Sequence, residues 1–165
     1  FWEDFMTNQS YYTPEEWKVV VSGPAVAGTL IVAADPAFFG AIKESAAIAQ
    51  AIIKAGQTSD VEIIKSIAAS SSKGQKYKTP DVPKDQGTEG AVKILVAECR
   101  KAARLVKEKS PDEAEDYTQY LLNIAKVTAE SSKEGGFLGI GATRVSEQET
   151  AALERLAEAL DLDTD

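Results

Sequence analysis

The residue types that carry most protein chemistry are scarce in this chain. It has no histidine and one cysteine, Cys99, so a Ser-His-Asp or Cys-His mechanism is impossible within it. A lone cysteine also rules out an internal disulfide and leaves no plausible zinc cluster. Carboxylates are plentiful, but the sequence alone pairs none of them across a fold. We therefore expect no enzyme activity and no cofactor.

A glycine-rich apolar segment, from Gly135 to Gly141, contains Phe137, Leu138 and Ile140. No strand precedes it and no Gly-Lys-Ser/Thr follows it, so a phosphate-binding loop is not predicted. Two interpretations remain open. The apolar side chains fold over an end of the core while the glycines allow tight turns, or they form an exposed loop that docks a protein partner, a second copy or a membrane surface.

A basic strip lies within residues 88–109, a segment with helical periodicity. It comprises Arg100, Lys101, Arg104, Lys107 and Lys109. The whole chain has a net charge of −8, so this asymmetry could dock an acidic partner or a phosphate group. The alternative is a solvated helix face whose cations suit a helix C-terminus. For partner contact we single out Arg100, Arg104 and Lys107.

Two stretches resemble parts of the TerB-like helical domains associated with tellurite resistance. One runs from Ile31 to Asp35 and leads to residues 43–46, and the other runs from Gly141 to Glu149. Those domains use an Ala-Asp-Gly turn and a Ser-x-x-Glu helix start to build an acidic metal site. This chain departs from that pattern, with Ala-Thr at 142–143 in place of Asp-Gly and proline after Asp35.

The resemblance implies a module that binds a metal or small ligand in a bacterial stress response. Asp35 and Glu44 are then the candidate metal ligands, although a calcium ion needs six or more oxygens and these two supply two or three. Without a metal, Asp35 is a helix N-cap and Glu44 lies on a solvated face. The glycine-rich segment also looks like one in uncharacterised bacterial helical proteins, which favours a bacterial origin.

Helix starts are well marked by capping boxes, in which Ser or Thr is followed three residues later by Glu. The pairs are Thr13 with Glu16, Ser59 with Glu62, Ser110 with Glu113, and Ser146 with Glu149. With the hydrophobic periodicity they predict helices over 14–34, 36–55, 60–69, 88–109, 111–132 and 147–160. A kink or break is expected at Gly23-Pro24, and Gly56 is expected to follow the end of the second helix. No segment offers a convincing strand.

The fold class is therefore all-α: one domain over residues 1–165, built as a mostly antiparallel bundle of five to six helices. Residues 1–10 form an N-terminal tail and residues 70–87 a polar surface loop. We expect the helix over 14–34 to be central and buried, with Gly28 at a close helix crossing. The second helix should bury the side chains of Phe39, Ile42, Ala46, Ala49 and Ile53.

The net charge of −8 disfavours binding to nucleic acid or to anionic membranes, which needs basic surface. Residues 19–34 are nearly all apolar but too few to span a bilayer comfortably. We therefore expect a cytoplasmic interaction or assembly protein that binds a protein partner or itself. Cys99 falls on the apolar face of its helix and is expected to be buried.

Overall fold

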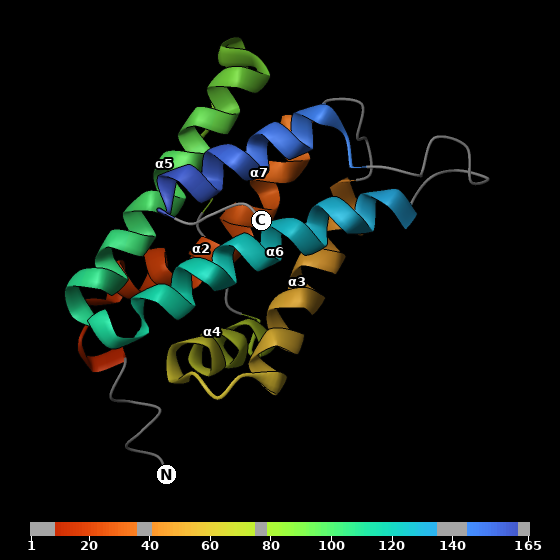
Figure 1. The fold of residues 1–165 in the computed structure, drawn as a ribbon. Helices are drawn as coiled ribbons and strands as arrows, with labels where there is room; N and C mark the ends of the chain where they lie inside the picture. Colours follow the sequence, from red (N-terminus) through yellow and green to blue (C-terminus); the bar gives the residue numbers. More distant parts are fainter. Residues whose placement is uncertain (1–8, 36–40, 75–78, 135–144, 162–165) are drawn as a thin grey trace.

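The computed structural model describes residues 9–35, 41–74, 79–134 and 145–161, except the side chains of residues 41–45, 84 and 132–134. Within these ranges the chain is helical and contains no strand, as predicted. The α-helices are α2 (Pro14–Ala34), α3 (Ala41–Thr58), α4 (Glu62–Ser72), α5 (Gly87–Lys109), α6 (Ala114–Glu134) and α7 (Glu147–Ala159) (Figure 1). Two short 3-10 helices, η1 (Lys84–Gln86) and η2 (Pro111–Glu113), precede α5 and α6.

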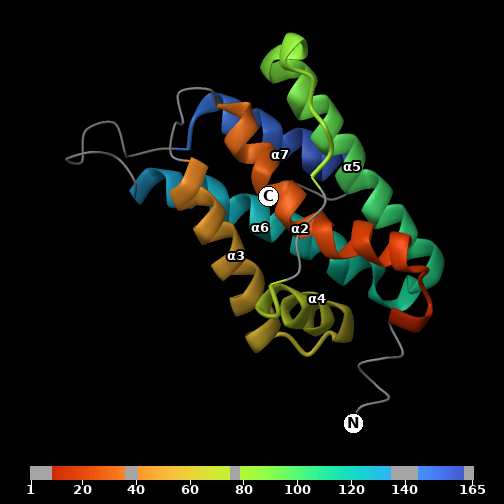
Figure 2. The same cartoon turned by 180° about the vertical axis from the view of Figure 1, so that it is seen from behind.

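Helix α2 lies at the centre, where it contacts α3, α5, α6 and α7 (Figure 2). By length and composition alone α2 is apolar enough to cross a membrane, with a mean hydropathy of 1.5, but 67% of that stretch is buried inside the protein. The other helices each bury one face against it or against each other. The figures also place α4 beside the end of α3, at the opposite side of the molecule from α7.

Of the predicted kink or break at Gly23-Pro24, the break does not occur, because α2 runs without interruption from Pro14 to Ala34, and the kink stays a prediction. The residues around the proline, from Val20 to Gly28, are all buried. Gly23 packs instead against the phenol of Tyr117 in α6, where a Cβ atom would overlap the phenol oxygen. The predicted close crossing at Gly28 is present: a Cβ atom there would lie 2.7 Å from Cδ1 and Cγ1 of Ile48 in α3.

Two of the four predicted capping boxes are confirmed, at the starts of α2 and α7. At α2, the Thr13 hydroxyl accepts a bond from the Glu16 backbone N–H at 3.2 Å, and the Glu16 carboxylate accepts one from the Thr13 N–H at 2.8 Å. The rings of Tyr12 and Trp17 close this end of the helix, with centroids 5.5 Å apart. Local sequence therefore determines where these helices begin.

The other two predicted boxes are wrong, because their side chains bond elsewhere. The Ser59 hydroxyl accepts from the backbone N–H of Val61 at 3.1 Å, and α4 starts after it. The Ser110 hydroxyl accepts from the Tyr12 phenol at 2.9 Å. The Glu113 carboxylate accepts from the backbone N–H of Ile63 at 2.8 Å and so caps α4 from a distant part of the chain.

The predicted loop over residues 70–87 is too long at both ends. Residues 70–72 form the last turn of α4, and residues 84–86 form η1. The hydroxyls of Ser71 and Ser72 bond back to the carbonyls of Ile67 and Ala68, both at 3.0 Å. Serine is tolerated in a helix when it bonds back in this way, so the serine-rich composition did not mark a loop.

The predicted end and inner face of the second helix are also wrong. Gly56 lies inside α3, where it packs against Ala68 of α4 so closely that a Cβ atom would overlap the Ala68 Cβ. The core of α3 is formed by Ile48 and Ile52. Of the predicted stripe, Ala46 is exposed, Ala49 and Ile53 are half-buried, and Phe39 and the side chain of Ile42 lie outside the described residues.

Candidate functional site

The residues predicted to bind a metal do not come together in the part of the chain that the structure describes. Asp35 lies at the C-terminal end of α2 and is buried. The side chain of Glu44 lies outside the described residues. Among the described residues, no group of three or more Asp, Glu, Cys or His side chains could hold a metal ion. Phe137, Leu138 and Ile140 also lie outside the described residues.

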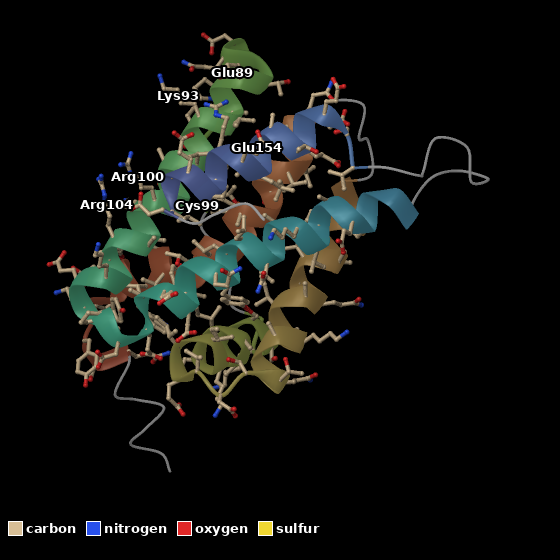
Figure 3. The ribbon with its side chains drawn as sticks, viewed as in Figure 1. Glu89, Lys93, Cys99, Arg100, Arg104 and Glu154 are labelled. Carbon is tan, nitrogen blue, oxygen red and sulfur yellow. The ribbon has the colours of Figure 1, made fainter. Side chains whose placement is uncertain are left out.

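Helix α5 separates its charges from its core side chains over its whole length. Its buried face consists of Ala91, Val92, Leu95, Cys99, Ala102 and Val106. The side chains of Arg100, Arg104 and Lys107 are exposed, and their spacing of four and three residues places them on one face of a helix. Figure 3 shows Arg100 and Arg104 pointing away from the body of the protein on the outer side of α5. We call Arg100, Arg104 and Lys107 the α5 cations.

The α5 cations make no ion pair with any described residue. The ion pairs among the described residues are Lys65–Glu62, Lys109–Glu16 and Arg155–Glu89. Lys109, which the sequence placed in the same basic strip, pairs instead with the Glu16 carboxylate in the first turn of α2, at 3.9 Å. Lys93 and Lys101 are exposed on the same helix without an ion pair. Cations outnumber carboxylates on the outer side of α5, where Glu108 is the carboxylate among the lining residues.

Two hollows flank the α5 cations. One, of about 550 Å³, lies on the outer side of α5 between Lys93 and Glu108. The other, of about 500 Å³, lies where α5 meets the start of α6 and the end of α7, and we call it the junction hollow. Its apolar lining consists of Ala103, Pro111, Ala114, Ala159 and Leu160.

The junction hollow has sides of opposite charge. Arg100, Arg104 and Lys107 line it from α5, while Glu115 lines it from α6 and Asp161 from the second position after α7. Among the described residues no ion pair closes across it. The sequence indicated the α5 side through its helical spacing. It gave no sign of the acidic side, because Glu115 and Asp161 come from elements whose neighbours are set by tertiary packing.

Cys99 lies on the core side of α5 and is completely buried, as predicted. Burial raises the pKa of its thiol to about 12, with a smaller contribution from the Glu98 carboxylate. A nucleophilic cysteine needs an accessible thiolate. The Cys99 thiol is protonated and inaccessible, so it is a packing residue beneath the α5 cations.

Two further hollows lie away from α5. One, of about 480 Å³, is bounded by α3, α4 and α6 and is lined partly by Ile64, Tyr120 and Val127. The other, of about 590 Å³, lies between the starts of α4 and η2 and includes the exposed carboxylates of Asp60 and Asp112. Sequence patterns do not indicate either, because their linings come from segments far apart in the chain.

No protein-family model matches the chain, and neither a curated protein nor a solved structure matches it. The function is therefore inferred from the geometry and charge of its own surface.

Proposed function

We propose that this protein is a non-enzymatic docking module that binds an acidic segment of a partner protein along the α5 cations. One observation carries the proposal: three cations are held in a row on one helix face, exposed, with no carboxylate paired to them among the described residues. In a chain with a net charge of −8, such a row is the surface to which an acidic segment is attracted.

The geometry next to this row also favours a protein ligand. The apolar lining of the junction hollow offers contact area beside the charges, and specific protein interfaces combine an apolar centre with a polar rim. Nucleic acid is a poorer candidate, because the negative charge of the whole chain opposes a polyanion. Phe137, Leu138 and Ile140 remain a proposed second contact for a partner or another copy of the chain.

Binding of a fluorescein-labelled oligo-glutamate peptide, followed by fluorescence anisotropy at low and high salt, tests the proposal. The native protein should bind it, and salt should weaken binding because exposed charges are screened. Arg100→Glu combined with Arg104→Glu should weaken binding by about tenfold or more, since each reversal replaces an attraction by a repulsion of similar size.

The matched control is Lys54→Glu combined with Lys73→Glu, which changes the net charge equally at exposed cations of α3 and at the end of α4. Circular dichroism would verify that both double variants are folded. If both double variants weakened peptide binding equally, net charge alone would explain the loss of affinity, and the proposal would be overturned. Preferential capture by phosphatidylserine vesicles instead of the peptide would also overturn it, in favour of a membrane ligand.

A further inference from the structure

We propose that the junction hollow recognises a two-sided charge pattern: the partner segment is a helix with carboxylates facing α5 and a lysine or arginine facing Glu115 and Asp161. This inference rests on the proposed function and specifies the chemistry of its ligand. It begins from the opposite charges on the two sides of the hollow and the lack of an ion pair between them among the described residues.

The α5 side favours a helical ligand. Residues rise by about 1.5 Å each along a helix, so Arg100, Arg104 and Lys107 extend over roughly 10 Å. A second helix laid alongside α5 presents carboxylates spaced i, i+4 and i+7 over the same length. The alanines that line the hollow, Ala103, Ala114 and Ala159, leave room for close approach, because the distance between packed helices depends on the side chains at the contact.

The opposite side is negative for two reasons. The carboxylates of Glu115 and Asp161 line it, and α7 ends there with its last carbonyls, which carry a partial negative charge. The backbone N–H of Asp161 donates to the carbonyl of Glu158 at 3.1 Å, so the backbone that carries this carboxylate is part of the end of α7. An all-acidic segment is therefore attracted by α5 and repelled by this side. A segment with cations on its second flank is attracted by both.

The test uses three alanine-based helical peptides with wild-type protein. The two-sided peptide has glutamates at i, i+4 and i+7 and a lysine directly after each glutamate, so that the two charges form adjacent stripes. The scrambled peptide has the same composition with the charges mixed on both stripes, and the acidic peptide has glutamates only. We expect the two-sided peptide to bind about fivefold more tightly than the scrambled one, the size expected from a few exposed charge contacts.

Glu115→Lys combined with Asp161→Lys provides a reversal of sign. This variant should bind the acidic peptide more tightly than the native protein does, and it should lose its preference for the two-sided peptide. The matched control, Asp60→Lys combined with Asp112→Lys, changes the net charge equally in a different hollow and should keep the preference.

The two proposals fail in different ways. If native protein binds the acidic and scrambled peptides as tightly as the two-sided one, and Arg100→Glu with Arg104→Glu still weakens all three, the two-sided pattern is overturned and acidic docking stands. If native protein binds none of the peptides, the proposed function fails, and the inference fails with it.

Discussion

The phenol of Tyr117 in α6 donates a hydrogen bond of 2.7 Å to the backbone carbonyl of Val20 in α2. In a regular helix that carbonyl accepts from the N–H four residues later, and residue 24 is a proline, which has none. Gly23 leaves room for the ring. Burial raises the pKa of Tyr117 well above its ordinary value, so the phenol stays a donor. The pair accounts for a proline inside a buried helix.

Replacing Tyr117 by phenylalanine should lower the free energy of unfolding by about 1–3 kcal/mol, the cost of leaving a buried polar group without its partner. Urea denaturation measures the loss. Tyr11→Phe is the matched control, because Tyr11 is 51% exposed, and it should change stability by less than about 0.5 kcal/mol. Equal stability of Tyr117→Phe and the native protein would show that Val20 needs no such donor.

Gly56→Ala should destabilise the protein more than Gly28→Ala. At Gly56 the added Cβ meets the Cβ of Ala68, so α3 and α4 must separate. At Gly28 it meets the side chain of Ile48, which can turn. Overpacking of this kind costs about 1–3 kcal/mol, so we expect that loss for Gly56→Ala and for the larger Gly28→Leu. Thermal unfolding gives the comparison.

Ala68→Gly added to Gly56→Ala should restore part of the stability that Gly56→Ala loses, because it removes the atom in conflict. Residues in contact couple in this way, whereas distant ones add independently. A double variant whose loss is the sum of the two single losses would rule out the close contact between α3 and α4.

Glu113→Ala should loosen the start of α4. Its carboxylate accepts from the Ile63 N–H, and losing a cap costs about 0.5–2 kcal/mol. Hydrogen exchange of the first α4 amides should become faster, while exchange in α7 stays unchanged. Asp112→Ala alters the neighbouring, exposed carboxylate and should leave α4 unaffected. Unchanged exchange in Glu113→Ala would show that this cap contributes nothing.

Stability should fall in alkaline solution. The thiol of Cys99 has a pKa of about 12 in the fold, raised from 9.0 mainly by burial. The folded state therefore binds more protons than the unfolded state in this range. The resulting stabilisation is complete below pH 9.0 and is lost as pH rises towards about 12. Tyr12 and Tyr117 are shifted upwards as well, both mainly by burial.

Urea denaturation midpoints test this dependence when they are measured from neutral pH to above about pH 10, where the thiol of the unfolded chain ionises. Cys99→Ala should lose less stability over that range than the native protein, because one of the protonated buried groups is gone. The same slope in both proteins would exclude Cys99 as a source of the pH dependence.

The fold was predictable where local signals act alone. Helices α5 and α7 lie close to their predicted bounds, because apolar periodicity and the Ser146 cap need no tertiary partner. The end of α3 and the start of α4 were misplaced because tertiary contacts act there. Gly56 allows α4 to approach, and the capping of α4 comes partly from Glu113, which lies far along the chain.

The candidate site was predictable only in part, for the same reason. One helix supplies Arg100, Arg104 and Lys107, so their shared face follows from helical spacing. Glu115 and Asp161 join them through the packing of α6 and α7 beside α5. No periodicity within one segment records that neighbourhood, and the acidic side of the hollow is visible only once the chain is folded.

The position of α2 along the chain bears on how the protein is made. Translation releases this apolar helix before α5, α6 and α7, three of the helices that cover it. Until those later helices leave the ribosome, the growing chain carries an uncovered hydrophobic segment, the kind of intermediate that aggregates unless it is shielded. We expect chains that stop before α6 to depend on chaperones, because α6 and α7, which help to bury α2 in the fold, are then missing.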